Sequence, residues 1–197
     1  ASPWVVVEAD DAKHIGIPDL VAMGGNLETE TLFSMYQNGI FPWPSPGYPL
    51  LWFSPINRAI LEFEKLQISR SFQRFLNKNN FTVTIDQAFI KVIEQCAHVP
   101  RPDQDGTWIL PDMIDAYTKF YAAGYAHSVE VWDGDQLVGG IYGVDAGGAF
   151  SAESMFHLVP NASKVALVNL VKHLSSRGLS WMDIQVLTPH LKKFGAE

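Results

Sequence analysis

Residues 128–156 read SVEVWDGDQLVGGIYGVDAGGAFSAESMF, and this stretch decides the fold. Residues 128–132 alternate as a β-strand does, and the Asp-Gly pair that follows is a hairpin signal. The chain returns over residues 136–144, turns again at a Gly-Gly pair, and forms a third strand over residues 149–156. The pattern predicts three consecutive strands joined by tight turns.

A helix and a fourth strand follow this stretch. The helix opens at Asn161 or Ser163 and runs to Arg177, where a glycine just past the last turn ends it. Residues 179–187 predict the strand, and residues 189–194 predict a short helix. The order of elements is strand, strand, strand, helix, strand, helix.

This order is that of an acetyltransferase-like (GNAT) core with a mixed, largely antiparallel sheet. The predicted fold class is therefore α+β. A helical, loop-rich N-terminal domain with a rigid Pro/Trp loop and a basic helix is expected over residues 1–100. The acetyltransferase-like catalytic domain is expected over residues 101–197, and the boundary is placed in the polar loop that runs from Pro100 to Gly106.

The first half predicts mostly helices and loops. Four helices are expected, at residues 30–37 after Thr29, 70–77 after Ser69, 87–97 after Asp86, and 112–123 before Gly124. Between the first two, the segment FPWPSPGYP (residues 41–49) carries four prolines. Because proline forbids a helix or a central strand, this segment is expected to be a rigid loop that holds aromatic groups.

Composition limits the class of protein. Hydrophobic residues make up 47% of the 197 residues, which is enough for a real core, and no apolar run is long enough to span a bilayer. The net charge of −7 argues against a general nucleic-acid coat, although residues 57–78 carry five basic residues against two acidic ones. A single cysteine, Cys96, excludes a disulfide framework and favours a reducing, cytoplasmic compartment. The sequence begins at Ala1 without a visible signal peptide, which we interpret as a processed or shortened start.

The loop before the long helix argues against coenzyme A as the acyl donor. In acyl-CoA-dependent members of this fold, a glycine-rich loop holds the pyrophosphate on backbone N–H groups at the helix N-terminus. Residues 157–163 read HLVPNAS, without glycine, and Pro160 removes one donor. The fold suggests acyl transfer, while the sequence argues for another donor.

Eight short motifs together resemble the leucyl/phenylalanyl-tRNA–protein transferase family. They occur in the family's order and span about residue 20 to residue 196. The motifs are MYQNGIFPW (35–43), WFSP (52–55), GTWI (106–109), AHSVEVW (126–132), GGIYGV (139–144), ESMF (153–156), ASK (162–164) and DIQV (183–186). Family members usually continue past the segment that ends at Ala196, so we expect either a short member or a chain that lacks this tail.

The resemblance implies a cytoplasmic enzyme of the bacterial N-degron pathway. Such an enzyme moves Leu or Phe from Leu-tRNA or Phe-tRNA to proteins whose N-terminal residue is Arg or Lys, which are then degraded. An aminoacyl-tRNA is an activated ester, so the reaction requires no ATP, metal or other cofactor. The enzyme must orient both substrates, help a proton leave the α-amine and stabilise the oxyanion.

Three polar residues of the second half are the implied catalytic residues. Asp183 and Gln185 lie two apart on a predicted strand and so point to one face, together with Trp181. By resemblance they are the catalytic pair, with Asp183 supplying negative charge and proton-acceptor support and Gln185 positioning the amine. Glu153 is implied to hold an ammonium group. From the residues alone, capping of a turn by the pair and a salt bridge from Glu153 to Lys164 remain open.

The resemblance also implies three binding regions. The side chain of the transferred amino acid needs an apolar pocket, for which Met155, Ile141, Phe150 and Val144 are the candidates, with plain core packing as the alternative. The 3′ adenine of tRNA is expected to stack on Trp43 and Trp108, with Tyr36 and Tyr117 beside it, unless these rings are simply core. The tRNA phosphates are expected to meet Arg70, Arg74 and Lys78, which form one helical stripe or a plain solvated face.

Two other function classes stay open. The first is an acyl-CoA-dependent N-acetyltransferase on the same fold, which the glycine-free loop opposes. The second is a non-catalytic module that binds N-terminal residues or tRNA ends, which would keep the aromatic groups but would not need Asp183 and Gln185. No membrane partner is expected, and no histidine spacing suggests a metal site.

Overall fold

The computed structural model describes residues 2–100 and 107–197, which form two β-sheets and their covering helices. The polar loop predicted to begin at Pro100 falls almost entirely outside the described residues. In chain order the elements are β1 (Ser2–Val6), α1 (Ala9–His14), β2 (Leu20–Gly25), α2 (Thr29–Gln37), β3 (Phe41–Pro42), β4 (Leu51–Phe53), β5 (Ala59–Glu62), the 3₁₀ turn η1 (Phe63–Lys65), α3 (Arg70–Lys78), β6 (Thr82–Ile85), α4 (Phe89–His98), α5 (Pro111–Ala122), β7 (Ala126–Asp133), β8 (Gln136–Asp145), β9 (Phe150–His157), α6 (Ala162–Ser176), β10 (Trp181–Gln185) and α7 (Pro189–Lys192).

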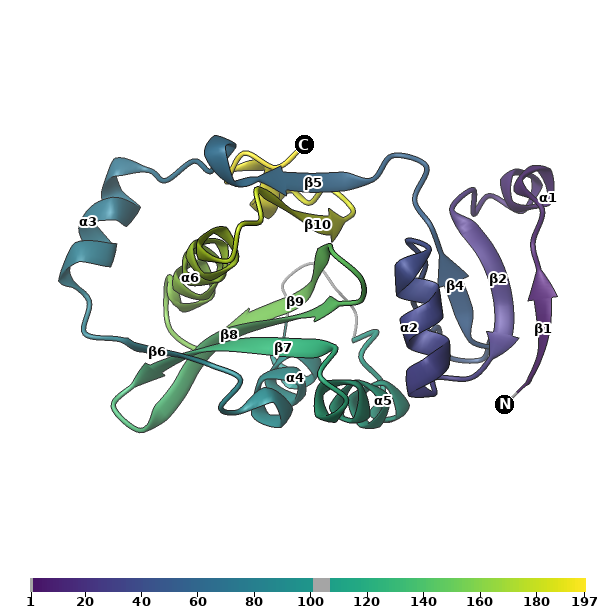
Figure 1. Cartoon of the computed structure of the whole chain (residues 1–197), viewed down its shortest axis with the longest axis horizontal. Helices are drawn as coiled ribbons and strands as arrows, with labels where there is room; N and C mark the ends of the chain where they lie inside the picture. The colour runs from purple at the N-terminus through teal and green to yellow at the C-terminus, as the bar shows by residue number, and fades with distance from the viewer. Residues whose placement is uncertain (1, 101–106) are drawn as a thin grey trace.

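The larger sheet has the strand order β5-β10-β9-β8-β7-β6. Neighbouring strands are antiparallel except β9 and β10, which are parallel and joined by the crossover helix α6. The α+β class, the three antiparallel strands and the helix that leads into β10 are thereby confirmed. Figure 1 shows α6 on one side of this sheet and α4 and α5 on the other.

Two apolar cores cover the two faces of this sheet. On the α6 side, Val165, Val168 and Leu174 pack against strand residues such as Ile141. On the α4/α5 side the core holds Phe89, and it continues without a break into α2 and the smaller sheet. Close packing on the α6 side depends on Gly139, where an added Cβ would lie 2.6 Å from the Cβ of Ala162.

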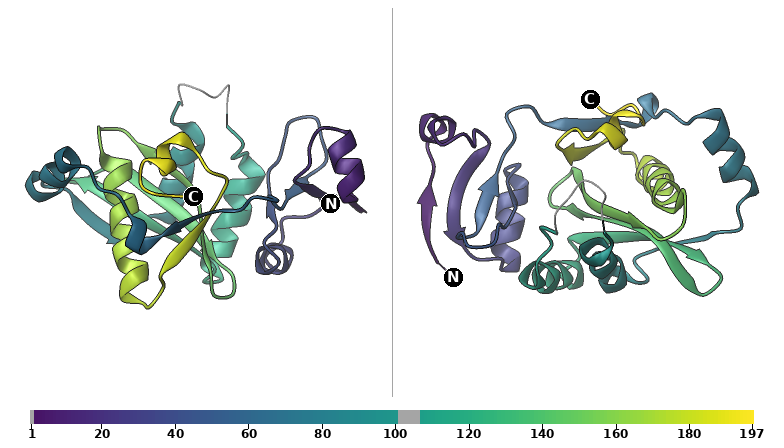
Figure 2. Two further views of the ribbon diagram at one scale, coloured as in Figure 1. Left: turned by 90° about the horizontal axis from the view of Figure 1, so that it is seen from above. Right: turned by 180° about the vertical axis from the view of Figure 1, so that it is seen from behind.

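The smaller sheet has the order β1-β2-β4-β3 and lies at one end of the molecule with α1 and α2 (Figure 2). Its edge strand β3 holds the first residues of the proline-rich segment, and an edge is where a strand tolerates proline. Trp52 is fully buried and donates its indole N–H to the carbonyl oxygen of Gly24. These contacts fix the proline-rich segment next to α2.

The sequence did not predict strands β1, β2, β4, β5 and β6. Two of them, β5 and β6, precede residue 100 yet form the two edges of the larger sheet. Between them the chain crosses the α6 side, where Phe72 of α3 joins the core. We therefore propose that the two units divide between Phe53 and Ala59, because the two sheets separate there.

Two of the three N-cap residues predicted for the first half differ from the structure. Ser69 caps α3 as predicted, since its Oγ accepts the backbone N–H of Phe72. Asp86 does not cap α4, because its carboxylate accepts the backbone N–H of Ser128 and contacts His127. The buried carboxylate of Glu130 accepts the N–H groups of residues 87 and 88, just before the helix, and no side chain caps α4 itself. Helix α2 begins one residue earlier than predicted, so that Thr29 is its first residue and Glu28 precedes it.

Within residues 2–100 and 107–197, no helix qualifies as a membrane span. The longest described helix, α6, has 15 residues, which is shorter than the roughly 20 that a bilayer requires.

Candidate active site

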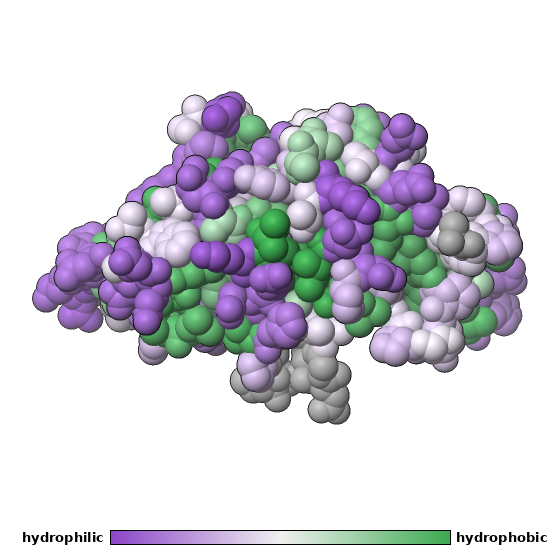
Figure 3. All heavy atoms as spheres, turned by 90° about the horizontal axis from the view of Figure 1, so that it is seen from below, coloured by the Kyte–Doolittle hydropathy of each residue, from purple (hydrophilic) through white to green (hydrophobic). Residues whose placement is uncertain are grey.

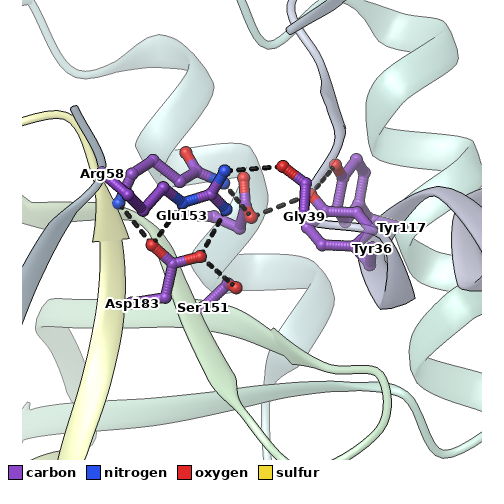
Figure 4. Close-up of polar contacts among 8 residues, drawn as sticks. Tyr36, Gly39, Arg58, Tyr117, Ser151, Glu153 and Asp183 are labelled. Carbon is purple, nitrogen blue, oxygen red and sulfur yellow. Dashed lines mark hydrogen bonds and ion pairs between the residues drawn. The ribbon is translucent and has the colours of Figure 1, made fainter. Parts of the chain in front are cut away.

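A cleft of about 400 Å³ lies between the end of α2, the start of β5 and the strands β9 and β10. The cleft contains Tyr36, Arg58, Ser151 and Asp183, which are far apart in the sequence. Figure 4 shows that their polar groups point toward one another, together with Glu153. The cleft is thus the place where the larger sheet and α2 bring their polar side chains together.

An ion pair between Arg58 and Asp183 forms the base of the cleft. The Nε of Arg58 donates to Oδ1 of Asp183 at 2.8 Å and its Nη2 donates to Oδ2, which is the two-pronged geometry typical of arginine and a carboxylate. The Nη1 of Arg58 donates to the carbonyl oxygen of Gly39 at 2.6 Å, and the guanidinium lies 5.3 Å from the ring centroid of Phe41. Arg58 therefore ties β10 to the end of α2.

The carboxylate of Asp183 has no free acceptor position. Oδ1 also accepts the backbone N–H of Gln185 at 2.8 Å, and Oδ2 accepts the hydroxyl of Ser151 at 2.9 Å. Two donors on each oxygen fill the four lone-pair sites that a carboxylate offers. Asp183 is therefore a fixed structural charge. The proton-acceptor part of its expected role has no lone pair left in this geometry.

Two backbone irregularities meet beside this ion pair. Strand β10 shifts its register against β5 between Asp183 and Gln185, and Gln185 has a φ of +64°, in the left-handed region. Strand β9 shifts its register against β8 between its residues 152 and 154, which makes Glu153 the extra residue of a β-bulge. In the parallel pair of β9 and β10, Ser151 lies opposite Asp183. The two strands therefore part at Glu153 and Gln185.

Gln185 and Glu153 hold each other across this fork. The Nε2 of Gln185 donates to Oε1 of Glu153 at 2.8 Å. No residue that the structure describes donates to Oε1 of Gln185 or bonds to Oε2 of Glu153, and neither oxygen is among the described buried atoms that lack a partner. One amide oxygen and one carboxyl oxygen thus keep acceptor capacity, on two partly buried side chains beside the cleft.

Burial raises the pKa of Glu153 to about 8. Desolvation is the main cause, because it disfavours the charged carboxylate, and the charge of Asp183 acts in the same direction. The hydrogen bonds from Tyr36 and Gln185 and the charge of Arg58 oppose this rise. Glu153 therefore exchanges its proton close to neutral pH, in the range where an α-amine with a pKa of about 8 does so.

The structure places Tyr36 and Tyr117 in a chain of hydrogen bonds that ends at Glu153. The hydroxyl of Tyr36 donates to Oε1 of Glu153 at 2.8 Å, and the hydroxyl of Tyr117 lies 2.5 Å from that of Tyr36. Both rings are buried, and desolvation raises the pKa of each hydroxyl well above 10. They form a neutral hydrogen-bonded support behind Glu153.

The candidates for the apolar pocket do not share one face of the sheet. Ile141 and Phe150 line a cavity of about 210 Å³ between the sheet and α6. Its wall also includes Leu170 and Leu174 and the polar residues Asp86, His127, Ser128, Asp145, His173 and Arg177. Met155 packs on the same side, whereas Val144 belongs to the core on the opposite face. The sequence placed Ser151, Glu153 and Met155 on one face, but the bulge at Glu153 reverses the alternation, so Ser151 and Met155 lie on opposite faces.

The aromatic candidates Trp43 and Trp108 lie together. Their ring centroids are 6.1 Å apart, and the ring of Trp43 is 43% exposed. Trp43 also lines a groove of about 450 Å³ that includes Val186, which follows Gln185 directly. An exposed aromatic surface therefore lies next to the fork of β9 and β10.

The basic candidates lie on α3, away from the cleft. The side chains of Arg70, Arg74 and Lys78 are all exposed. Figure 1 places α3 at the opposite end of the molecule from α2, and Figure 3 shows hydrophilic side chains gathered at that end. Lys164, the open alternative partner of Glu153, instead lies over the ring of Phe72, 5.8 Å from its centroid.

Arg58 is the functional residue that sequence reasoning missed. In the sequence it is one of five basic residues within positions 57–78, and its only further distinguishing feature is its position three residues after the WFSP motif. Arg58 comes close to Asp183 only because residues 59–62 form a strand that pairs with the strand of Asp183. That short strand was not predicted.

The described part of the chain contains no group of three or more His, Cys, Asp or Glu residues arranged to hold a metal ion. The carboxylates of Asp183 and Glu153 accept hydrogen bonds from side-chain and backbone donors of the chain itself.

Comparison with known proteins gives a consistent result. Residues 60–197 match the family model described as "Leucyl/phenylalanyl-tRNA protein transferase", and residues 25–56 match the model of its N-terminal domain. A protein of Nitratidesulfovibrio vulgaris (strain DP4) named leucyl/phenylalanyl-tRNA–protein transferase is 48% identical over 186 residues, which cover 94% of this chain and 80% of that protein. The protein of the same name from Maridesulfovibrio salexigens is 51% identical over 189 residues, which cover 95% and 78% of the two chains.

A solved structure, that of L-PGS from Bacillus licheniformis, aligns with a TM-score of 0.48 at 13% sequence identity. The alignment covers 82% of this chain and 54% of that one.

We predict that Arg58→Met lowers the free energy of unfolding by about 3 kcal/mol, because it leaves the buried carboxylate of Asp183 without its counter-charge. Adding Asp183→Leu should restore most of this loss, since no unpaired charge then remains buried. Urea denaturation of the two variants measures both effects. The matched control is Lys119→Met, which breaks the exposed pair with Asp115 and should leave the midpoint unchanged. A single Arg58→Met variant as stable as the wild type would contradict the assignment.

We predict that Glu153→Gln changes how stability depends on pH. A carboxyl group with a raised pKa stabilises the folded state while it is protonated, and that stability is lost as the pH rises from 4.5 through about 8. The wild type should therefore lose stability relative to Glu153→Gln between pH 5 and pH 9. Denaturation midpoints across this range measure the difference, with Glu94→Gln, an exposed residue outside the network, as control. A constant difference would refute the raised pKa.

Proposed function

The chain belongs to the leucyl/phenylalanyl-tRNA–protein transferase family, and on this premise we propose that it moves Leu or Phe from the 3′ end of a charged tRNA to the α-amine of proteins that begin with Arg or Lys. It is an aminoacyltransferase. The observation that carries the assignment of the site is the fork of β9 and β10, where Glu153 and Gln185 present open oxygens above a fixed ion pair.

The reaction forms one amide bond and breaks one ester bond. The α-amine nitrogen of the acceptor attacks the ester carbonyl carbon of the aminoacyl-tRNA, and the bond to the ribose 3′-oxygen then breaks. A proton leaves the amine and reaches that ribose oxygen as the tRNA departs. The ester is already activated, so the enzyme's contribution is orientation and control of the proton.

The open oxygens at the fork suit the attacking amine. Oε1 of Gln185 can accept one of its hydrogens, because the Nε2 of the same amide is held by Glu153. Oε2 of Glu153 can accept the proton that the amine loses, because its pKa of about 8 lies near that of the amine. Asp183 and Arg58 act as positioning residues, since Asp183 holds the backbone N–H of Gln185 in place.

The cavity beneath the sheet suits the side chain of the transferred amino acid. Where β9 and β10 part, an aminoacyl group can pass from the cleft toward α6. A cavity of about 210 Å³ between the sheet and α6 has Ile141, Phe150, Leu170 and Leu174 in its wall, next to polar residues such as Asp86 and His127. We assign the donor side chain to this cavity, without Val144, which faces the other core.

The tRNA is assigned to the remaining surfaces. Its 3′ adenine would stack on the exposed ring of Trp43, beside Trp108, which contributes about 1–3 kcal/mol per stacked base. The stripe of Arg70, Arg74 and Lys78 on α3 would meet phosphates farther along the tRNA through charge alone. Since charged tRNA is a cytoplasmic substrate, the enzyme is assigned to the cytoplasm and to the N-degron pathway of protein degradation.

We predict that the wild type transfers radiolabelled Leu or Phe from charged tRNA to peptides that begin with Arg or Lys, and not to peptides that begin with Ala. Gln185→Ala should lower kcat/KM at least about 100-fold, because it removes the group that orients the amine. Label counted in the peptide measures the transfer. Gln136→Ala, an exposed glutamine at the start of β8, is the matched control and should transfer normally.

Two results would contradict the proposal. Transfer to none of the peptides by a folded wild type that binds tRNA would leave a binding module. Acetylation of the same peptides from acetyl-coenzyme A would favour the acetyltransferase alternative.

We predict that Ile141→Val raises the rate of Phe transfer relative to Leu transfer by up to about tenfold, because it removes a methylene from the wall of the donor cavity. Val144→Ala, on the same strand but on the opposite face, is the control and should leave the ratio unchanged. Competition between Leu-tRNA and Phe-tRNA for one Arg peptide measures the ratio. If only Val144→Ala changed the ratio of Phe to Leu transfer, the donor side chain would be assigned to the opposite face of the sheet.

A further inference from the structure

We propose that Trp181, with Glu62 across the strand pair, binds the positively charged side chain of the acceptor's first residue. The inference rests on the proposed function, and it assigns the part of the chain that distinguishes Arg and Lys from neutral residues.

The position of Trp181 relative to the catalytic fork follows from the register of β10 and β5. Asp183 lies opposite Ile60, and Trp181 lies opposite Glu62. Residues two apart on a strand point to the same face, so Trp181 and Asp183 share a face about 6.6 Å apart along the strand. An acceptor whose α-amine lies at Gln185 can therefore extend its long side chain along this face toward Trp181.

Two cavities meet at this point. The catalytic cleft and a second groove of about 770 Å³ both include Ile60 and Trp181 in their walls. The second groove also includes Glu62 and Glu64. Ile60 and Trp181 thus lie between the cleft and the groove that holds these carboxylates, and Trp181 is 40% exposed.

The two ends of the β5–β10 strand pair differ in charge. Arg58 precedes β5 at the end nearest Gln185, and its positive charge disfavours an acceptor cation there. At the other end, Lys65 contacts both Glu62 and Glu197, while no described residue pairs with Glu64. The three carboxylates of Glu62, Glu64 and Glu197 outnumber the one ammonium group of Lys65, so the net charge of this end is negative. A cationic side chain is favoured only in the direction of Trp181.

The chemistry of this subsite fits arginine and lysine equally. The face of an indole ring attracts a guanidinium or an ammonium group. The apolar stem of either side chain can lie against Ile60 and the ring while its charged end approaches Glu62. A short or neutral side chain gains neither contact, so the subsite selects for positive charge and length.

The test uses the full chain and acceptor peptides that begin with Arg or with citrulline, its uncharged isostere. In Trp181→Leu, the KM for the Arg peptide should rise about tenfold while kcat changes little, because the ring touches the side chain and not the reacting atoms. The preference for Arg over citrulline should fall by a similar factor. Trp181→Tyr keeps an aromatic face and should recover most of the preference.

The control is Trp4→Leu, which removes an equally exposed indole from β1 in the smaller sheet and should leave both constants unchanged. An unchanged Arg-to-citrulline preference in Trp181→Leu, with normal transfer by the wild type, would overturn the subsite alone. Absence of transfer by the wild type would overturn the proposed function and the subsite with it. Circular dichroism of Trp181→Leu confirms that the variant is folded.

Discussion

The ion pair between Arg58 and Asp183 is the interaction on which the arrangement of the site depends. A carboxylate with 5% of its surface exposed is costly unless donors surround it, and here the guanidinium, a serine hydroxyl and a backbone N–H supply all four hydrogen bonds. These donors come from β9, β10 and the residue before β5, and Arg58 also reaches the end of α2. One buried charge therefore ties the edge of the larger sheet to the end of α2.

The sequence predicts the fold best where local signals agree with the tertiary structure. Residues 128–156 combine alternation with glycine turns, and they form the antiparallel strands β7, β8 and β9 as expected. The edge strands β5 and β6 have only four residues each, and their partners lie about 120 and 50 residues away in the chain. Nothing within such a short window distinguishes a strand from a loop, because the pairing itself decides the structure.

The site shows the same division between local and long-range information. Resemblance and strand spacing bring out Asp183, Gln185 and Glu153, and the structure places all three at the fork. Spacing fails at Glu153 because a β-bulge adds one residue and reverses the face of everything beyond it. Arg58 and the hydroxyl of Tyr36 act through partners more than 100 residues away, and no periodicity in the sequence can indicate such contacts.

The two carboxyl groups of the site differ because their hydrogen-bonding capacity is used differently. The two carboxylate oxygens of Asp183 accept four hydrogen bonds. Asp183 therefore holds its neighbours in place but has no lone pair left to accept a proton from the substrate. Glu153 accepts two bonds on one oxygen and keeps the other open, and desolvation raises its pKa to about 8. A bulge lies at Glu153 and a left-handed backbone conformation at Gln185, and the two side chains meet beside the cleft. The bulge and the left-handed residue therefore place a proton acceptor, Glu153, next to the fixed charge of Asp183.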